Sequence, residues 1–244
     1  FDSVGQVYPR SLDFEAVALL AQLASAMVNF SNMVRLMAGL GLGHEGFGEE
    51  QSGSSAMPHK KNTRTCERMK GFLYVLCGHV TMTSHLLGDQ WFEGDVSCSV
   101  VRRIVFPDAF LAFDGLCEAV LTVLDEMQIF PGAIKSDLDK YLPFLNTTAL
   151  LSAFQDKGVG RETAHQMIRK HALQAVEMIE NGEEPQFLFG LLSEAILTRP
   201  QIMEIGTQQN HGLAEDQVDR VCRKISAVVV RHPVAVEYKP APIL

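Results

Sequence analysis

The sequence predicts an all-α protein: a long-helix bundle followed by a smaller α-helical C-terminal domain. Three long stretches repeat apolar residues at alternating steps of three and four, which is the spacing of one helix face. The alternation of apolar and polar residues that is typical of half-buried strands is nearly absent. Hydrophobic residues make up 47% of the 244 positions, enough to fill the core of such a protein.

The first predicted helix covers residues 12–37. Its apolar stripe comprises Leu12, Ala16, Leu19, Leu23, Met27, Phe30, Val34 and Met37. At a rise of 1.5 Å per residue, a helix of about 26 residues is about 40 Å long. This length favours a bundle over a small globular domain.

Two further long helices are predicted after residue 62. The second covers residues 63–87, with Thr63 or Thr65 as its N-cap, and the third runs from about residue 99 to 127, with Ser97 or Ser99 as its N-cap. Pro107 lies inside the third helix and removes one backbone hydrogen bond. Because apolar residues extend beyond one face of all three helices, we expect a second side to be buried in a homo-oligomer.

A domain boundary is predicted near residues 130–132, where the helical segments become shorter. Residues 1–128 form the bundle portion in this interpretation, and residues 129–244 form the C-terminal helical domain. Breaks are expected near residues 157–160 and 181–182, where glycines interrupt the helical pattern. Residues 228–230 are three valines, which fit either a helix end or a strand in the tail.

The overall composition argues against several classes of partner. The net charge is −8 and no run of Lys or Arg exceeds two residues, so we expect no binding to nucleic acid or to an anionic membrane. No apolar run reaches 18 residues, the length at which a membrane-spanning helix would be predicted. The five cysteines show no C-x-x-C spacing and indicate reduced thiols in a cytoplasmic protein.

Because the chain starts at Phe1 and not at Met, we expect it to be a piece of a longer protein.

Residues 41–62, here called the signature loop, show neither helical nor strand periodicity. Structureless loops of more than about 15 residues are usually functional. Residues 53–62, the motif within this loop, combine two serine hydroxyls with a proline and with lysines. Backbone amides of a Gly-Ser-Ser turn can converge on a carboxylate, and Lys60 adds a positive charge. The alternative is an exposed polar linker.

Other patterns in the chain carry less information. Residues 41–46 match G-x-G-x-x-G, but they follow a helix and not a strand, so we do not interpret them as a dinucleotide site. The eight histidines lack a spacing suited to a metal. Residues 91–103 place two arginines in the first turns of a helix, where a phosphate could bind, although an ordinary capped helix with surface arginines is an equal alternative.

The motif Gly-Ser-Ser-Ala-Met-Pro-His-Lys-Lys-Asn resembles the signature of the fumarase/aspartase superfamily, whose members cleave succinyl compounds and release fumarate. The branch that cleaves succinylated purine nucleotides is the most similar, because His59, residues 6–10 and residues 91–103 all fit it. Two positions depart from the family pattern. Thr63 stands where proline is common, and Gly94 stands where an arginine of the nucleotide site is expected.

The resemblance implies a role for each matching residue. Ser54 would be the catalytic base, Lys60 would hold the substrate carboxylates, and Glu67 would be the acidic residue that the family requires. The remaining residues would bind substrate: Gln6, Arg10, Ser55, Met57, His59, Asn62, Ser99 and Arg103, of which Ser99 and Arg103 match phosphate-binding positions.

The resemblance also implies what accompanies the site. The substrate would be a small succinylated purine nucleotide, and no metal or redox cofactor would be required. The protein would be a homotetramer with active sites shared between chains, and a missing N-terminal region would supply the general-acid histidine. Three alternatives remain: the carboxymuconate-cycloisomerising branch of the superfamily, a non-catalytic helical scaffold, and a piece that is inactive alone.

Overall fold

A computed structural model describes residues 2–3, 5–47, 57, 61–89, 91 and 95–239, and it confirms the all-α class. The chain divides into two compact units, which are described separately here. Unit 1 comprises Phe1–Phe130 and Tyr238–Leu244, and unit 2 comprises Pro131–Glu237.

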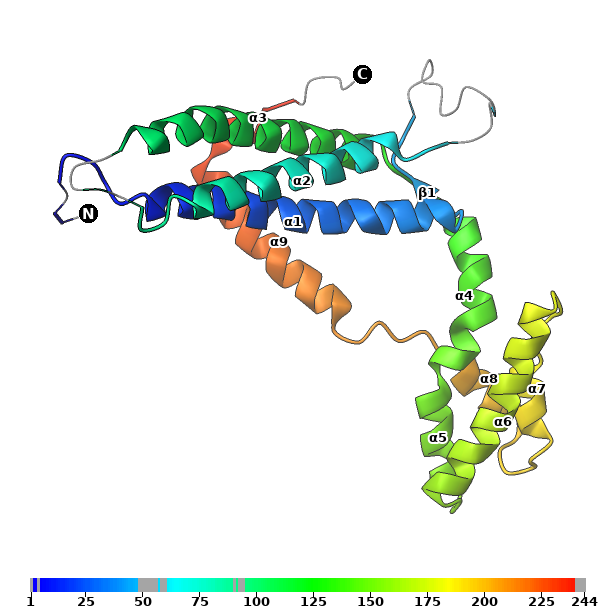
Figure 1. Ribbon diagram of the computed structural model, residues 1–244. Helices are drawn as coiled ribbons and strands as arrows, with labels where there is room; N and C mark the ends of the chain where they lie inside the picture. Colours follow the sequence, from blue (N-terminus) through cyan, green and yellow to red (C-terminus); the bar gives the residue numbers. More distant parts are fainter. Residues whose placement is uncertain are drawn as a thin grey trace. The chain divides into compact units, whose positions relative to one another are not determined.

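Unit 1 is a bundle of three long helices, α1 (Ser11–Gly39), α2 (Arg64–Ser84) and α3 (Val96–Glu126), which lie side by side in Figure 1. Helices α1 and α3 run in the same direction, and α2 runs in the opposite one. The stripe predicted for α1 was wrong, since Leu12, Leu19 and Leu23 are exposed and the buried face carries Val17, Ala24 and Val28 instead. Apolar residues extend beyond one face of this helix, so its period did not fix which side is buried. Most residues of the stripes predicted for α2 and α3 do face the three-helix core. Its fully buried members include Val17, Ala24, Met69, Leu76, Val105, Ala109, Leu116 and Ala119.

A two-residue ribbon closes one end of the bundle. Strand β1 (Gly43–His44) follows α1 and pairs antiparallel with β2 (Gln128–Ile129), which follows α3. A side chain on Gly43 would lie 2.6 Å from the Gln128 carbonyl oxygen, so the ribbon requires glycine there. The sequence predicted neither strand, because two residues are too few to show a period. The ribbon brings the ends of α1 and α3 together.

The cap predicted for the third helix was wrong, and of the two residues predicted for the second helix Thr63 is at the N-cap position but makes no capping bond with its side chain. Asp95, not Ser97 or Ser99, caps α3: its carboxylate accepts a hydrogen bond from the Ser97 backbone N–H at 2.6 Å, and this bond lowers the pKa of Asp95. At α2 the flanking Thr63 makes no side-chain capping bond. The carboxylate that caps α2 comes from residue 45 and is described with the site below.

Unit 2 contains shorter helices, of which those between residues 131 and 206 pack around its own core, whereas the described residues from 207 on are exposed. That core includes Leu150, Phe154, Ile168, Phe187, Leu191 and Ile202. The predicted breaks at residues 157–160 and 181–182 fall between helices, and the three valines belong to a helix end. The helices are α4 (Pro131–Leu145), α5 (Thr147–Asp156), α6 (Arg161–Glu180), α7 (Phe187–Leu192), α8 (Arg199–Gly206), α9 (Ala214–Arg231) and α10 (Pro233–Val236).

Helix α1 is long and apolar enough to cross a membrane by length and composition. Within the bundle it is nevertheless a core helix, since its buried stripe packs against α2 and α3. The stripe also contains Asp13 and Ser31, which are 1% and 0% exposed, and the carboxylate of Asp13 forms an ion pair with α3. A buried carboxylate with a partner inside the protein fits a helix of a folded bundle better than a lipid-facing segment.

Candidate active site

Of the predicted catalytic residues, the structure describes Glu67, which lies at the end of the bundle where α2 begins. Ser54, Ser55, His59 and Lys60 lie outside the described residues. Of the others, Met57 is exposed, Asn62 is half-buried just before α2, and Glu67 lies in the first turn of α2. The Glu67 carboxylate accepts a hydrogen bond from Arg64 at 3.0 Å and is exposed, so it is accessible from solvent in a single chain.

Glu45 is a buried carboxylate at this end that sequence reasoning missed. It is 3% exposed, its Oε1 accepts a hydrogen bond from the Thr65 backbone N–H, and its Oε2 accepts one from the Cys66 N–H, both at 2.8 Å. The positive end of α2 is therefore already neutralised by a residue from before the motif. Burial, followed by the hydrogen bond and charge of Glu45, raises the pKa of the Cys66 thiol, which stays uncharged.

Glu45→Ala is expected to destabilise the protein by about 2–4 kcal/mol, because two backbone donors at the start of α2 lose a charged acceptor. Glu45→Gln keeps one acceptor and should cost less. Urea unfolding measures both values, with Asp125→Asn, at an exposed position of α3, as the matched control. An unfolding free energy for Glu45→Ala equal to that of the control would contradict this capping role.

His44 lies beside Glu45 and contacts the residue that follows Lys60. Its Nδ1 accepts a hydrogen bond from the Gly46 N–H at 3.0 Å, and its Nε2 lies 3.2 Å from Nζ of Lys61. The ring is 6% exposed and packs edge-on against Phe47 and Phe130. Burial and then the charge of Lys61 lower the pKa of His44, so the neutral imidazole is favoured.

The lowered pKa of His44 makes a directional prediction for stability against pH. In the unfolded chain this histidine takes up a proton near pH 6.5, whereas the folded chain takes it up only at lower pH. Its contribution to stability is therefore present above about pH 6.5 and is lost as the pH falls towards the folded pKa. We expect Tm to decrease less between pH 7 and pH 5.5 in His44→Asn than in the wild type. Identical slopes in a differential scanning measurement would remove His44 as the cause.

The predicted nucleotide-binding residues belong to the other end of the bundle, where α1 and α3 begin. Gln6 and Arg103 are exposed, and Ser99 is half-buried on α3. Arg10 is only 7% exposed, and its guanidinium carbon lies 4.8 Å from the centre of the Tyr8 ring. Within the described part of the chain, Nε of Arg10 is buried without a hydrogen-bond partner.

Arg102 and Asp13 also lie at this end, and sequence reasoning assigned neither to the site. Nε of Arg102 forms an ion pair with Oδ2 of Asp13 at 2.9 Å, and the Tyr8 hydroxyl donates to Oδ1 of Asp13 at 2.7 Å. Burial and then the hydrogen bond to Asp13 raise the pKa of Tyr8. The only sequence signal was the pair of adjacent arginines, which does not reveal which of the two points inward.

The two groups of predicted residues are not brought together in one chain. Glu67 is at the N-terminus of α2, whereas Ser99 and Arg103 are at the N-terminus of α3, which runs antiparallel to α2, so they lie at the opposite end of the bundle (Figure 1). The 21 residues of α2 correspond to a separation of about 30 Å. A single nucleotide-sized substrate cannot contact both ends.

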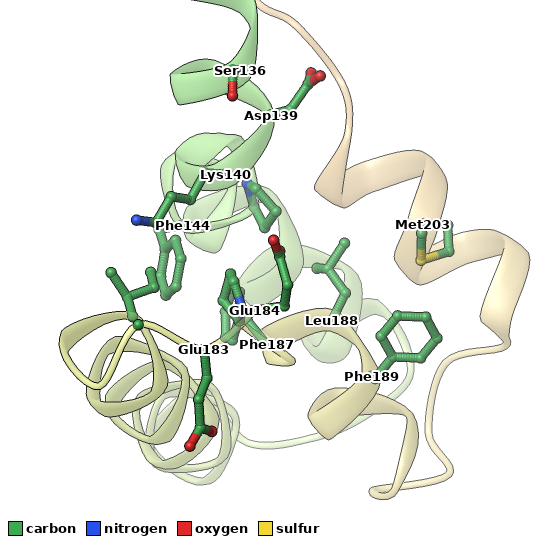
Figure 2. A pocket seen from close by; sticks show the side chains of 14 residues that line it. Ser136, Asp139, Lys140, Phe144, Glu183, Glu184, Phe187, Leu188, Phe189 and Met203 are labelled. Atoms are coloured by element: carbon green, nitrogen blue, oxygen red, sulfur yellow. The ribbon is translucent and has the colours of Figure 1, made fainter.

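Unit 2 contains a pocket of about 410 Å³ (Figure 2), which none of the predicted site residues lines. Phe144 and Phe187 stack at a centroid distance of 5.0 Å and form part of its wall, and Lys140, Glu183 and Glu184 lie around them. In the described part of the chain, no three His, Cys, Asp or Glu side chains are grouped as a metal site requires.

Comparisons with known proteins agree with the motif. Residues 2–78 match the family described as Lyase. The adenylosuccinate lyase of Saccharomyces cerevisiae is 33% identical over 189 residues, covering 75% of this chain and 39% of that protein. The adenylosuccinate lyase of Bacillus subtilis is 31% identical over 177 residues, covering 70% of this chain and 40% of that protein. The chain thus spans about two fifths of the length of these relatives.

Solved structures share the fold. A fumarate lyase from Mesorhizobium sp. BNC1 superposes with a TM-score of 0.69 at 18% identity, over 87% of this chain and 47% of that one. The 3-carboxy-cis,cis-muconate lactonizing enzyme of Pseudomonas putida superposes with a TM-score of 0.63 at 17% identity, over 79% of this chain and 42% of that one. The matched Lyase region, the adenylosuccinate lyase relatives and the shared helical fold together identify this chain as a member of the fumarase/aspartase superfamily of lyases.

Proposed function

We propose that this chain is part of a C–N lyase that cleaves adenylosuccinate to AMP and fumarate. By the same chemistry it would cleave the succinylated aminoimidazole carboxamide nucleotide to its carboxamide product and fumarate, which places the enzyme in purine biosynthesis. The observation that supports this proposal most strongly is the ten-residue motif at 53–62, together with adenylosuccinate lyase relatives that align with most of the chain.

The proposed reaction is a base-initiated β-elimination. Ser54 removes the proton next to a carboxylate of the succinyl group, which leaves an aci-carboxylate with two negative charges. Lys60, Asn62 and the loop amides are suited to stabilise that charge, since preorganised donors act most strongly where charge develops. A serine is a weak base at its ordinary pKa, so Ser54 depends on the same positive surroundings. The carbon–nitrogen bond then breaks, and a general acid from outside this chain protonates the departing nitrogen.

We further propose that the active enzyme is a cytoplasmic homotetramer with shared active sites. Two features support this proposal: the predicted site residues are divided between opposite ends of the bundle, and large apolar side chains are exposed along it. Those side chains include Leu19, Leu23, Met33, Leu36, Ile104, Phe110 and Leu111. An antiparallel neighbour would bring the loop end of one chain to the nucleotide end of another. Sedimentation showing a stable monomer would contradict the proposal.

A second candidate function is the carboxymuconate-cycloisomerising reaction, which is favoured by the fold shared with the Pseudomonas putida enzyme. An ultraviolet assay that follows loss of adenylosuccinate, run beside one that follows lactonisation of carboxymuconate, separates the two. The assay requires the protein at its full encoded length, because this chain spans about two fifths of its relatives. Turnover of adenylosuccinate alone supports the proposal, and turnover of carboxymuconate alone replaces it. Turnover of neither supports a helical scaffold.

A further inference from the structure

We propose that Arg102 is a positioning residue that holds residues 6–10 against the first turns of α3 and thereby aligns Gln6 with Arg103. This inference rests on the proposed function, because it assigns Gln6 and Arg103 to the substrate. The Arg102 side chain is half-buried, and its guanidinium is engaged with Asp13 and Tyr8 and not left for a ligand.

The contacts of Arg102 join three parts of the chain. Its Nε pairs with Asp13 on α1 at 2.9 Å, and one terminal nitrogen donates to the Tyr8 hydroxyl at 2.5 Å. The Tyr8 hydroxyl in turn donates to Asp13 at 2.7 Å, which closes a three-membered network. The guanidinium carbon also lies 5.5 Å from the centre of the Phe106 ring, one turn further along α3. An ion pair at one nitrogen and a hydrogen bond at another hold the guanidinium in place.

The charges in this network explain why it holds its geometry. Asp13 is 1% exposed, and its buried carboxylate requires a partner, because an unpaired buried charge is strongly unfavourable. Arg10 and Arg102 both lie over the Tyr8 ring, at 4.8 Å and 5.4 Å, so the ring is held between two cations. Loss of the Arg102 guanidinium would leave the buried carboxylate of Asp13 without its ion-pair partner.

The position of Arg102 in α3 determines what it aligns. Successive residues of an α-helix differ by about 100° around its axis. With Arg102 directed at Asp13, the neighbouring Arg103 is directed outwards, and it is exposed. Gln6 is exposed and lies two residues before Tyr8, which the network holds. The network therefore sets the distance between the two predicted ligand-binding groups, and a displacement of about 1 Å at such groups can cost up to about 100-fold.

The test compares kinetic and binding constants of conservative variants of the full-length protein. Arg102→Lys keeps the charge, but a single ammonium cannot make both the ion pair with Asp13 and the hydrogen bond to Tyr8 in the same geometry, and Tyr8→Phe removes only the hydroxyl. We expect KM for adenylosuccinate, and Kd for AMP by calorimetry, to rise about 10- to 100-fold in Arg102→Lys, with kcat changed much less. Because both variants break one network, the double variant should be no worse than the weaker-binding single variant.

Lys135→Ala is the matched control, because Lys135 forms an exposed ion pair with Asp139 in unit 2 and should leave KM and Kd unchanged. A purely structural role would lower Tm without raising KM, and that result would overturn the inference. If the wild type cleaves adenylosuccinate and Arg102→Lys keeps the wild-type KM, only this inference fails. If the wild type neither cleaves adenylosuccinate nor binds AMP, the proposed function fails, and this inference fails with it.

Discussion

Ser54→Ala is expected to abolish fumarate release while the protein still binds AMP. A catalytic base accounts for about 10²–10⁴-fold in rate, and alanine leaves no group at that position to accept the proton. The binding groups at the other end of the bundle, Gln6, Ser99 and Arg103, are unaffected by the change. We therefore expect kcat to fall at least about 10³-fold, with the Kd for AMP unchanged.

The control for Ser54→Ala is Ser52→Ala, which removes a hydroxyl from the same loop two residues earlier and outside the motif. It should keep turnover close to that of the wild type. Kinetics at saturating adenylosuccinate, with calorimetry for AMP, give both quantities. Turnover retained in Ser54→Ala would reassign the base, whereas loss of AMP binding would point to misfolding of the site.

The long helices could be predicted from sequence because their information is local. The predicted range 12–37 compares with α1 at Ser11–Gly39, and the stripe predicted for α3 is buried from Val105 to Val123. The face predicted for α1 was wrong: of its eight stripe residues only Val34 is buried, because apolar residues cover more than one side of that helix. Packing three such stripes together uses the same period in every helix. Helix α6 (Arg161–Glu180) fills the stretch between the two predicted glycine breaks.

The contacts that organise the candidate site could not be predicted, because they join residues far apart in the chain. Glu45 caps a helix that begins about 20 residues later, and a single sequence does not indicate that the intervening loop returns to it. Thr63 has the local signature of a cap, but the buried carboxylate of Glu45 is a stronger acceptor for the same amides. Likewise, the pairing of Asp13 with Arg102 spans two helices.

Mixing two inactive variants is expected to restore activity if each active site combines one end of the helical bundle of one chain with the opposite end of the bundle of another chain. Ser54→Ala damages only the loop end, and Arg103→Ala damages only the nucleotide end, which lies about 30 Å away along the bundle. In a tetramer assembled from both variants, some sites receive an intact loop from one chain and an intact Arg103 from another. With random assembly at equal amounts, about one site in four is complete.

The experiment co-expresses the two variants with different affinity tags and purifies tetramers that carry both. We expect about a quarter of the wild-type kcat per site, where each variant alone has almost none. Ser54→Ala paired with Lys60→Ala is the matched control, because both changes damage the same end and no combination of chains yields an intact loop. If Ser54→Ala mixed with Arg103→Ala stayed as inactive as this control, each site would have to be built within one chain. Because Glu67 and Arg103 lie at opposite ends of the bundle of one chain, they could then not contact the same substrate.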